Sequence, residues 1–211
     1  MADADSRKGA SYSTPELLRW LEGLHAPHDA ALQRAFAAPQ REGLPAIQVA
    51  PSEGKLLELL LKMIGARKVV EVGTLAGYST IRLARALPQG GKVWSVELDE
   101  KHAQVARANL EAAQVSSRAE VVVGSALERL PSLEVHGPFD AVFIDADKEH
   151  YDVYGRWAAK HTRPRGLLLG DNAYFFGRLM EDSPAAAAMR RFHEEATTAY
   201  DTVCVPTPDG L

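Results

Sequence analysis

Short runs of apolar residues recur through residues 66–211 and are separated by longer stretches with a helical period. Positions inside these runs are almost all hydrophobic, which is typical of strands buried on both faces of a parallel sheet. Strands that alternate with helices at this spacing predict right-handed crossovers and an α/β fold with a doubly wound, mostly parallel sheet. The expected strands cover residues 68–72, 93–98, 120–123, 141–144, 166–170 and 202–205, and the main helices cover 78–87, 100–113, 149–161 and 185–199.

Residues 1–65 have a helical pattern instead. Thr14 followed by Pro15 predicts a helix start, because the hydroxyl can cap the helix and proline fits its first turn. We expect this helix to end at Pro27, a second to cover residues 29–37, a loop at 39–51 and a largely buried helix at 52–64. The chain is therefore expected to form one domain, 1–211, with a helical cap at 1–65 and the sheet at 66–211. The first helix shows an apolar stripe at Leu17, Leu18, Trp20, Leu21 and Leu24.

Composition narrows the class of protein. Hydrophobic residues make up 46% of the chain and charged residues 25%, a balance typical of a globular protein with a full core. The net charge of −4 argues against binding to nucleic-acid phosphates, and no apolar run is long enough to span a bilayer. The first residues contain acids and no apolar stretch of a secretion signal, so we expect a cytoplasmic protein without a membrane partner. The single cysteine, Cys204, cannot form an internal disulfide and should be buried in the last strand.

A glycine loop follows the first expected strand. Glycines at this position let the backbone turn tightly and approach a ligand at the end of the sheet. The loop has the spacing G-x-x-x-G, with Gly73 and Gly77, and Leu75 stands where a dinucleotide-binding loop would carry its second glycine. Glu71 would repel phosphates and suits a cationic or amino ligand. The pattern therefore disfavours NAD.

An acid ends the second expected strand. Glu97 follows Gly73 by 24 residues and can accept hydrogen bonds from both hydroxyls of a ribose. Together with Glu71 and the loop, it predicts a pocket for S-adenosylmethionine (SAM), which carries ribose and a cationic sulfonium but no phosphate. The alternative is a simple strand-to-helix turn flanked by two solvated acids.

Oxygen-bearing side chains follow two later strands. Asp145 follows the strand 141–144, and Asp171 and Asn172 follow the strand 166–170. The carboxyl ends of neighbouring parallel strands converge at one edge, so these side chains should meet and supply oxygen ligands to a divalent cation such as Mg²⁺. Alternatively, they only cap turns.

Lys148 lies three residues after Asp145. A cation and a cationic cofactor beside it would disfavour its ammonium form, which helps it accept a proton. The alternative is a surface lysine paired with Glu149 or Asp152.

The sequence gives little support for a zinc site or for serine-hydrolase chemistry. The seven histidines show no zinc-binding spacing, although His150 is close to the acidic residues, and no G-x-S-x-G motif is present. The aromatic residues Tyr174, Phe175 and Phe176 form either a wall for a substrate or a lid over the core.

Several motifs together resemble a known family. EVGTLAGYST (71–80), VELD (96–99), FDAVFIDADKEHYDVY (139–154) and GLLLGDN (166–172) are similar to the cation-dependent SAM O-methyltransferases of the catechol and caffeoyl-coenzyme A group. The resemblance covers roughly residues 40–211, including QVAPSEGKLL (48–57), and implies a Rossmann-like methyltransferase fold. It implies contacts of Glu71, Gly73, Thr74 and Ser79 with the methionine end of SAM, of Glu97 with ribose, of Ala126 with adenine and of Asp147 with an amino group. It matches Asp145, Asp171 and Asn172 to the metal ligands and Lys148 to the catalytic base, and Asp145 also counts among the catalytic and cofactor-binding residues.

The sequence departs from the family at three places. Val49 stands where plant members carry threonine near the cofactor, so we expect a contact through its backbone. Phe176 replaces an asparagine that touches substrate in the plant enzymes, which weakens the expectation of a coenzyme A thioester. The family closes with an antiparallel pair of strands, and we expect the last strand to be missing after Leu211.

The expected reaction is methyl transfer from SAM to one hydroxyl of a vicinal aromatic diol, with Mg²⁺ on both oxygens and Lys148 as proton acceptor. The resemblance also implies a homodimer with the N-terminal helices at or near the interface. The alternatives are a non-catalytic SAM-binding or interaction protein on the same fold and an NAD-dependent oxidoreductase. A nucleic-acid methyltransferase is disfavoured, because DADK (145–148) replaces the proline-aromatic motif used on bases.

Overall fold

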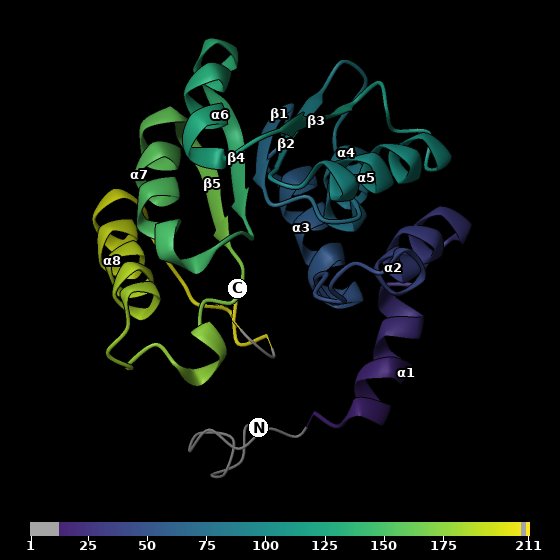
Figure 1. The fold of residues 1–211 in the computed structure, drawn as a ribbon, viewed down its shortest axis with the longest axis horizontal. Coiled ribbons are helices and arrows are strands. Elements are labelled where there is room, and N and C mark those ends of the chain that lie inside the picture. The colour runs from purple at the N-terminus through teal and green to yellow at the C-terminus, as the bar shows by residue number, and fades with distance from the viewer. Residues whose placement is uncertain (1–12, 208–209) are drawn as a thin grey trace.

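Five parallel strands form the centre of the molecule (Figure 1). The computed structural model describes residues 13–207 and 210–211 of the chain. Strands pair in the order β3-β2-β1-β4-β5, so the chain reverses direction across the sheet between β1 and β4. This is the doubly wound α/β fold predicted from the sequence. The strands are β1 (Lys68–Val72), β2 (Lys92–Glu97), β3 (Ala119–Val123), β4 (Phe139–Ile144) and β5 (Thr162–Gly170).

Helices cover both faces of the sheet (Figure 1). Successive residues of one strand point to opposite faces, so Val69 packs in a core with α3, α4 and α5, and Val70 packs in a core with α6, α7 and α8. Both faces are therefore apolar, as the continuous hydrophobic runs predicted. The helices are α1 (Pro15–His25), α2 (Ala30–Glu42), α3 (Pro51–Met63), α4 (Tyr78–Ala86), α5 (Glu100–Ala112), α6 (Ala126–Leu133), α7 (Tyr151–His161) and α8 (Pro184–Ala199).

Local chemistry explains where several helices begin. The side chains of Thr14, Asp29 and Ser183 each accept a hydrogen bond from a backbone N–H in the first turn of the helix that follows. Asp99 accepts two such bonds, from the N–H groups of Lys101 and His102. These caps satisfy donors that have no partner inside the helix.

One predicted boundary is wrong, and one helix was missed. The loop expected at 39–51 begins later, because α2 continues through Pro39 to Glu42 and ends at Gly43, whose φ of +65° suits glycine. Helix α6 was not predicted at all, since ALERLPSL has Pro131 near its end and only eight residues.

The C-terminal strand expected at 202–205 is absent from the described residues. This segment has no regular secondary structure, and Cys204 is exposed rather than buried in a strand. An apolar run alone predicted the strand, but no neighbouring strand pairs with it, because β5 is the last strand of the sheet.

Helix α3 is buried on one face only, whereas the sequence predicted that most of it would be buried. Leu57 and Leu61 are fully buried, but Leu59 is 45% exposed and Met63 80% exposed. The sheet covers only one side of this helix, and the exposed apolar positions lie on its other side.

The structure bears on two expectations about location. Among the described residues, no helix combines the length and the apolar character that crossing a bilayer requires. Residues 1–12, which supply most of the argument against a secretion signal, lie outside the described part of the chain.

The one-sided burial of α3 leads to a stability prediction. Leu57→Ala should lower the free energy of unfolding by about 2–5 kcal/mol, because it removes buried methyl groups and leaves a cavity. Leu59→Ala on the same helix should cost less than about 1 kcal/mol, because its side chain is half exposed. Urea unfolding of both variants measures the difference, and equal losses would contradict the packing described for α3.

Candidate active site

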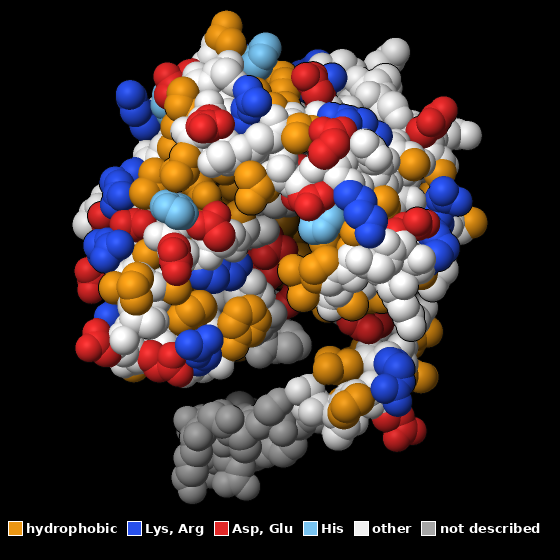
Figure 2. Space-filling view, viewed as in Figure 1, with side chains coloured by type: hydrophobic (Ala, Val, Ile, Leu, Met, Phe, Trp, Pro, Cys, Tyr) orange, Lys and Arg blue, Asp and Glu red, His pale blue; other side chains and the backbone are white. Residues whose placement is uncertain are grey.

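A cavity of about 620 Å³ opens at the carboxyl ends of the central strands. Figure 2 shows this face hollowed between the two groups of helices, with acidic side chains in the hollow. Ligand pockets of doubly wound folds lie at this edge, where the strand order reverses. Glu71 and Asp171 are buried and are not among the lining residues. The other predicted site residues all line the cavity: Val49, Gly73, Thr74, Ser79, Glu97, Ala126, Asp145, Asp147, Lys148 and Asn172.

Gly73 allows the loop after β1 to pass directly over the end of β4. Its φ is +102°, and a Cβ atom at this position would lie 1.9 Å from the carbonyl oxygen of Asp145. Any other residue would therefore push apart the loop and the strand end that carries Asp145. Gly77, at φ +79°, brings the start of α4 against the backbone of Ala106 in α5.

Glu97 holds the same loop from the end of β2. Its Oε2 accepts hydrogen bonds from the backbone N–H groups of Thr74 (3.2 Å) and Leu75 (2.8 Å). Its Oε1 accepts one from the N–H of Asp99 (3.0 Å) and lies 3.4 Å from Nδ1 of His102. Glu97 is only 7% exposed, so the alternative of a solvated acid is wrong. The sequence did not indicate the role of Glu97 in fixing the loop.

Glu71 is fully buried behind the loop. Its Oε2 accepts hydrogen bonds from the hydroxyls of Thr80 and Ser95, both at 2.5 Å. Burial raises the pKa of the Glu71 carboxyl to about 7, although the hydroxyls of Ser79, Ser95 and Thr80 oppose this shift. The negative charge of Asp145 raises the pKa further. A positive charge in the cavity would favour the ionised form of Glu71.

The structure brings Asp145 and Asp171 together. Ile144 of β4 pairs in register with Gly170 of β5, so the residues that follow these two lie side by side. The N–H of Asp171 donates to the carbonyl of Ile144 at 2.9 Å. Asn172 comes next in a left-handed conformation, φ +55°, and its side chain reaches the cavity.

These three residues form an all-oxygen donor set that fits a hard divalent cation. The described residues contain no group of three or more His, Cys, Asp or Glu side chains that could hold a metal ion. The predicted set has two carboxylates and one amide, so it does not depend on such a group. Two carboxylates that follow neighbouring strand ends also favour a cation near them.

Lys148 lies in the site and not on the surface. Its side chain is 12% exposed, and its Nζ lies 3.4 Å from Oδ1 of Asp145 and 3.1 Å from the phenol oxygen of Tyr151. The alternative pairing with Asp152 is wrong, because Asp152 binds Arg156 and Arg191. An acid, a lysine and a buried phenol therefore adjoin each other at this end of the cavity.

Tyr151 is a site residue that the sequence did not single out. Its hydroxyl lies 2.6 Å from the carbonyl oxygen of Ile144 and 2.8 Å from that of Asp171, so it joins the ends of β4 and β5. Burial and the charges of the neighbouring aspartates raise the pKa of Tyr151 well above its usual value, which keeps the phenol protonated. In the sequence, only its position three residues after Lys148 could have indicated that Tyr151 belongs to the site.

Asp147 is exposed at the rim of the cavity. Its Oδ1 accepts a hydrogen bond from the hydroxyl of Tyr154 at 2.6 Å, and its Oδ2 contacts Nδ1 of His150. The two contacts fix the carboxylate before any ligand binds, and they show that His150 touches Asp147. Tyr154 also lines the cavity.

The three aromatic residues after Asn172 divide between the two alternatives. Phe175 is 5% exposed and packs in the core, whereas Phe176 is 61% exposed and lines the cavity. Ile47, from the segment between α2 and α3, is 71% exposed and also lines it. Phe176 is therefore a wall residue and Phe175 a core residue.

This chain is similar in sequence to known O-methyltransferases. Residues 26–204 match the O-methyltransferase family. The chain belongs to this family. The catechol O-methyltransferase of Niastella koreensis is 41% identical over 189 residues, which cover 86% of each chain. The catechol O-methyltransferase of Mycobacterium tuberculosis is 45% identical over 179 residues, covering 83% of this chain and 81% of that relative.

Two solved structures superpose closely on this chain. The Bacillus cereus enzyme in complex with SAH has a TM-score of 0.85 at 38% identity, covering 90% of this chain and 89% of that chain. Cofactor-bound Rv0187 from MTB also has a TM-score of 0.85, at 40% identity, covering 94% of this chain and 92% of that chain. This O-methyltransferase is an enzyme of the SAM-dependent class, and both the NAD-dependent oxidoreductase and the non-catalytic alternative are set aside.

The buried carboxyl of Glu71 should make the stability of the ligand-free enzyme depend on pH. Its pKa is about 7 in the folded protein against an ordinary value of 4.5, so between these values only the folded state keeps the proton. Stability should therefore fall as pH rises from 5 to 8, by at most about 3 kcal/mol from this residue. Glu71→Gln should remove that part of the fall.

Urea unfolding at pH 5, 6, 7 and 8 measures this effect as the difference between wild type and variant. Exposed Glu128 provides the control, because Glu128→Gln should leave the slope unchanged. Parallel pH profiles for wild type and Glu71→Gln would contradict the assignment.

Proposed function

We propose that this enzyme transfers a methyl group from SAM to one hydroxyl of a catechol-like vicinal diol, with a divalent cation such as Mg²⁺ in the site. The observation that carries the proposal is one cavity whose lining includes both the Glu97 loop and the Asp145–Lys148 end. The Glu97 loop suits a cationic nucleoside, and the Asp145–Lys148 end suits an acidic hydroxyl. The names of the two catechol O-methyltransferase relatives support the acceptor class.

The residues around the glycine loop fit SAM. When bound, SAM supplies a methyl group on a positively charged sulfur. Gly73, Thr74 and Ser79 line the cavity beside buried Glu71, whose ionised form would favour the positive end of the cofactor. Glu97 would bind the ribose hydroxyls with the acceptor capacity that remains beside its loop contacts. Ala126 at the start of α6 and Asp147 would face the adenine end, and Val49 would contribute backbone or van der Waals contact.

Asp145, Asp171 and Asn172 fit a divalent cation. Such an ion would act as a Lewis acid that lowers the pKa of a bound phenolic hydroxyl and orients its neighbour. All three donors are oxygens, as Mg²⁺ prefers, and two of them follow residues paired in register. Asp171 is buried, so its carboxylate is held by the protein and not by solvent.

Lys148 would accept the proton of the attacking hydroxyl at its Nζ. The neighbouring phenol of Tyr151 and carboxylate of Asp145 hold that nitrogen at the end of the cavity. Phe176 and Ile47 would pack against a flat aromatic acceptor and exclude water from the reacting atoms. Much of the acceleration would come from this fixed orientation of acceptor and donor.

The proposed assembly and location of the enzyme also follow from the family resemblance. A homodimer with the N-terminal helices near the interface agrees with the exposed apolar residues of α1, Leu17, Trp20 and Leu24. A cytoplasmic location and the absence of nucleic-acid and membrane partners stay predictions from the sequence.

Removal of the cation should abolish methyl transfer. EDTA should stop turnover of a catechol with labelled SAM, and Mg²⁺ should restore it, while SAM binding measured by calorimetry largely survives. Acceptors with a single hydroxyl should react poorly, because they cannot chelate the ion. Asp171→Ala should act like EDTA, because it removes one of three protein ligands, whereas Asp182→Ala at an exposed position should be inert.

Two results would contradict the cation mechanism. One is full activity in EDTA of a protein shown to be metal-free by elemental analysis. The other is equal turnover of vicinal diols and single phenols. Failure to bind SAM would instead overturn the methyl donor.

Lys148→Met should lose turnover on the order of 10²–10⁴-fold, because it removes the proton acceptor. Binding of SAM and Mg²⁺ should stay close to that of the wild type. Exposed Lys160 on α7 gives the matched control, since Lys160→Met removes the same charge outside the cavity. A near-normal rate for Lys148→Met at pH 7 would show that Lys148 does not take part in proton transfer.

A further inference from the structure

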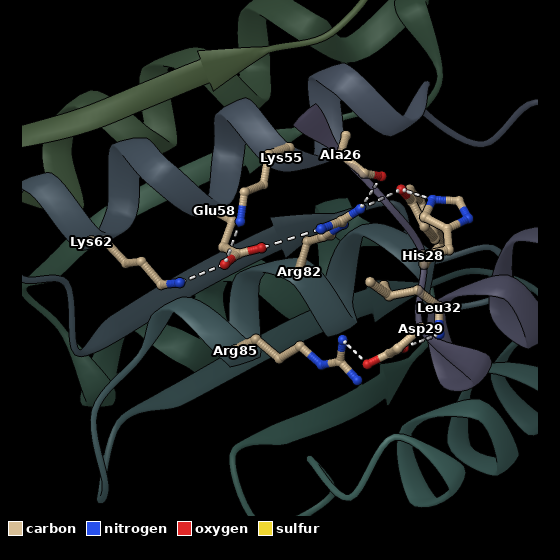
Figure 3. A network of polar contacts seen from close by, with 10 residues as sticks. Ala26, His28, Asp29, Leu32, Lys55, Glu58, Lys62, Arg82 and Arg85 are labelled. Carbon is tan, nitrogen blue, oxygen red and sulfur yellow. Dashed lines mark hydrogen bonds and ion pairs between the residues drawn. The ribbon is translucent and has the colours of Figure 1, made fainter. Parts of the chain in front are cut away.

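A buried polar network joins the α1–α2 segment (residues 15–42) to α3 and α4 (Figure 3). Arg82 of α4 is 3% exposed and lies at its centre. Its Nη1 donates to Oε2 of Glu58 in α3 at 3.3 Å, and its Nη2 donates to the carbonyl of Ala26, between α1 and α2, at 3.4 Å. Buried charges are retained in proteins only where they are paired in this way.

His28 extends this network from the α1–α2 segment. Its Nε2 lies 2.8 Å from the hydroxyl of Tyr78, which also accepts from Nη2 of Arg82 at 3.3 Å. Its Nδ1 lies 3.3 Å from the side-chain oxygen of Gln33, which can only accept. Nδ1 therefore carries the proton, Nε2 accepts, and the phenol of Tyr78 donates to it. Burial lowers the pKa of His28, which favours this neutral form.

The ring of Tyr78 packs against residues from three segments. His28 and Phe36 pack against it with ring centroids 5.2 Å and 5.1 Å away. Gly54 of α3 approaches so closely that a Cβ atom there would lie 3.1 Å from Cε1 of the ring. Tyr78 is 1% exposed, so its position depends on these neighbours and on its hydrogen bonds.

Tyr78 is also part of the cavity wall. It is the first residue of α4, directly after Gly77 of the glycine loop, and it precedes Ser79. Residues 47–49 also line the cavity and are tied to the α1–α2 segment as well, because Nε2 of Gln48 donates to the carbonyl of Phe36 at 2.9 Å. The α1–α2 segment thus reaches two walls of the cavity, through His28 and through Phe36.

We propose that His28 is a positioning residue for the cofactor: its hydrogen bond to Tyr78 fixes the start of α4 and the glycine loop in the form that binds SAM. This inference rests on the proposed function, because it takes the cavity as the SAM site. Without the acceptor on His28, the buried phenol loses a partner, and the loop that precedes it becomes less ordered before SAM binds.

Two variants of His28 test the hydrogen bond. His28→Leu keeps the volume and removes the acceptor, whereas His28→Gln keeps an acceptor near the position of Nε2. His28→Leu should raise the Kd for SAM, measured by calorimetry, about three- to tenfold and raise KM for SAM in parallel, while kcat at saturation changes less than about twofold. His28→Gln should restore most of the affinity.

Arg85 offers a matched control. Arg85 of α4 forms an ion pair with exposed Asp29 at 2.8 Å, so it joins the same α1–α2 segment to the same helix, but it is half-buried outside the cavity (Figure 3). Arg85→Ala should leave the Kd for SAM within about twofold of the wild type. Thermal unfolding of all three ligand-free variants shows that they are folded at the temperature of the titration.

Each result has a distinct meaning. An unchanged Kd in His28→Leu, an equal loss in His28→Gln or an equal loss in Arg85→Ala would overturn the positioning role and leave the proposed function standing. A wild-type enzyme that does not bind SAM would overturn the proposed function itself.

Discussion

The site depends on the contact between the backbone of Gly73 and the carbonyl of Asp145. This contact joins the ends of β1 and β4, the two strands between which the sheet reverses its order. It places the loop beside the strand end that carries the acidic residues, and Glu97 then fixes the loop through two backbone N–H groups. Because the loop and Asp145 touch, the cofactor region and the proposed cation region form one continuous wall.

The sequence predicted those parts of the molecule that depend on local pattern. Strands β1 to β4 largely coincide with apolar runs, whereas β5 begins at Thr162, four polar or proline residues before the run at 166–170. Most helices begin at a capping residue or a proline that the sequence displays. Because strand ends in a parallel sheet meet at one edge, the positions of Asp145 and Asp171 could be inferred without a structure. The family motifs added roles for single residues.

The sequence failed where long-range packing decides the outcome. Residues 202–205 have the composition of a strand, but pairing with a neighbour makes a strand, and none pairs there. Tyr151 and His28 act through partners 20 and 50 residues away, which no local period reveals. The buried carboxyl of Glu71 likewise accepts hydrogen bonds from hydroxyl groups of two other elements, Thr80 of α4 and Ser95 of β2.

The proton on Glu71 has a consequence for the energetics of binding. Near neutral pH this carboxyl is only partly ionised in the empty enzyme, since its pKa is about 7. A cationic ligand that favours the carboxylate releases that proton to the buffer as it binds. The observed heat of association then includes the ionisation heat of the buffer, so two buffers at one pH would report different enthalpies for the same binding event.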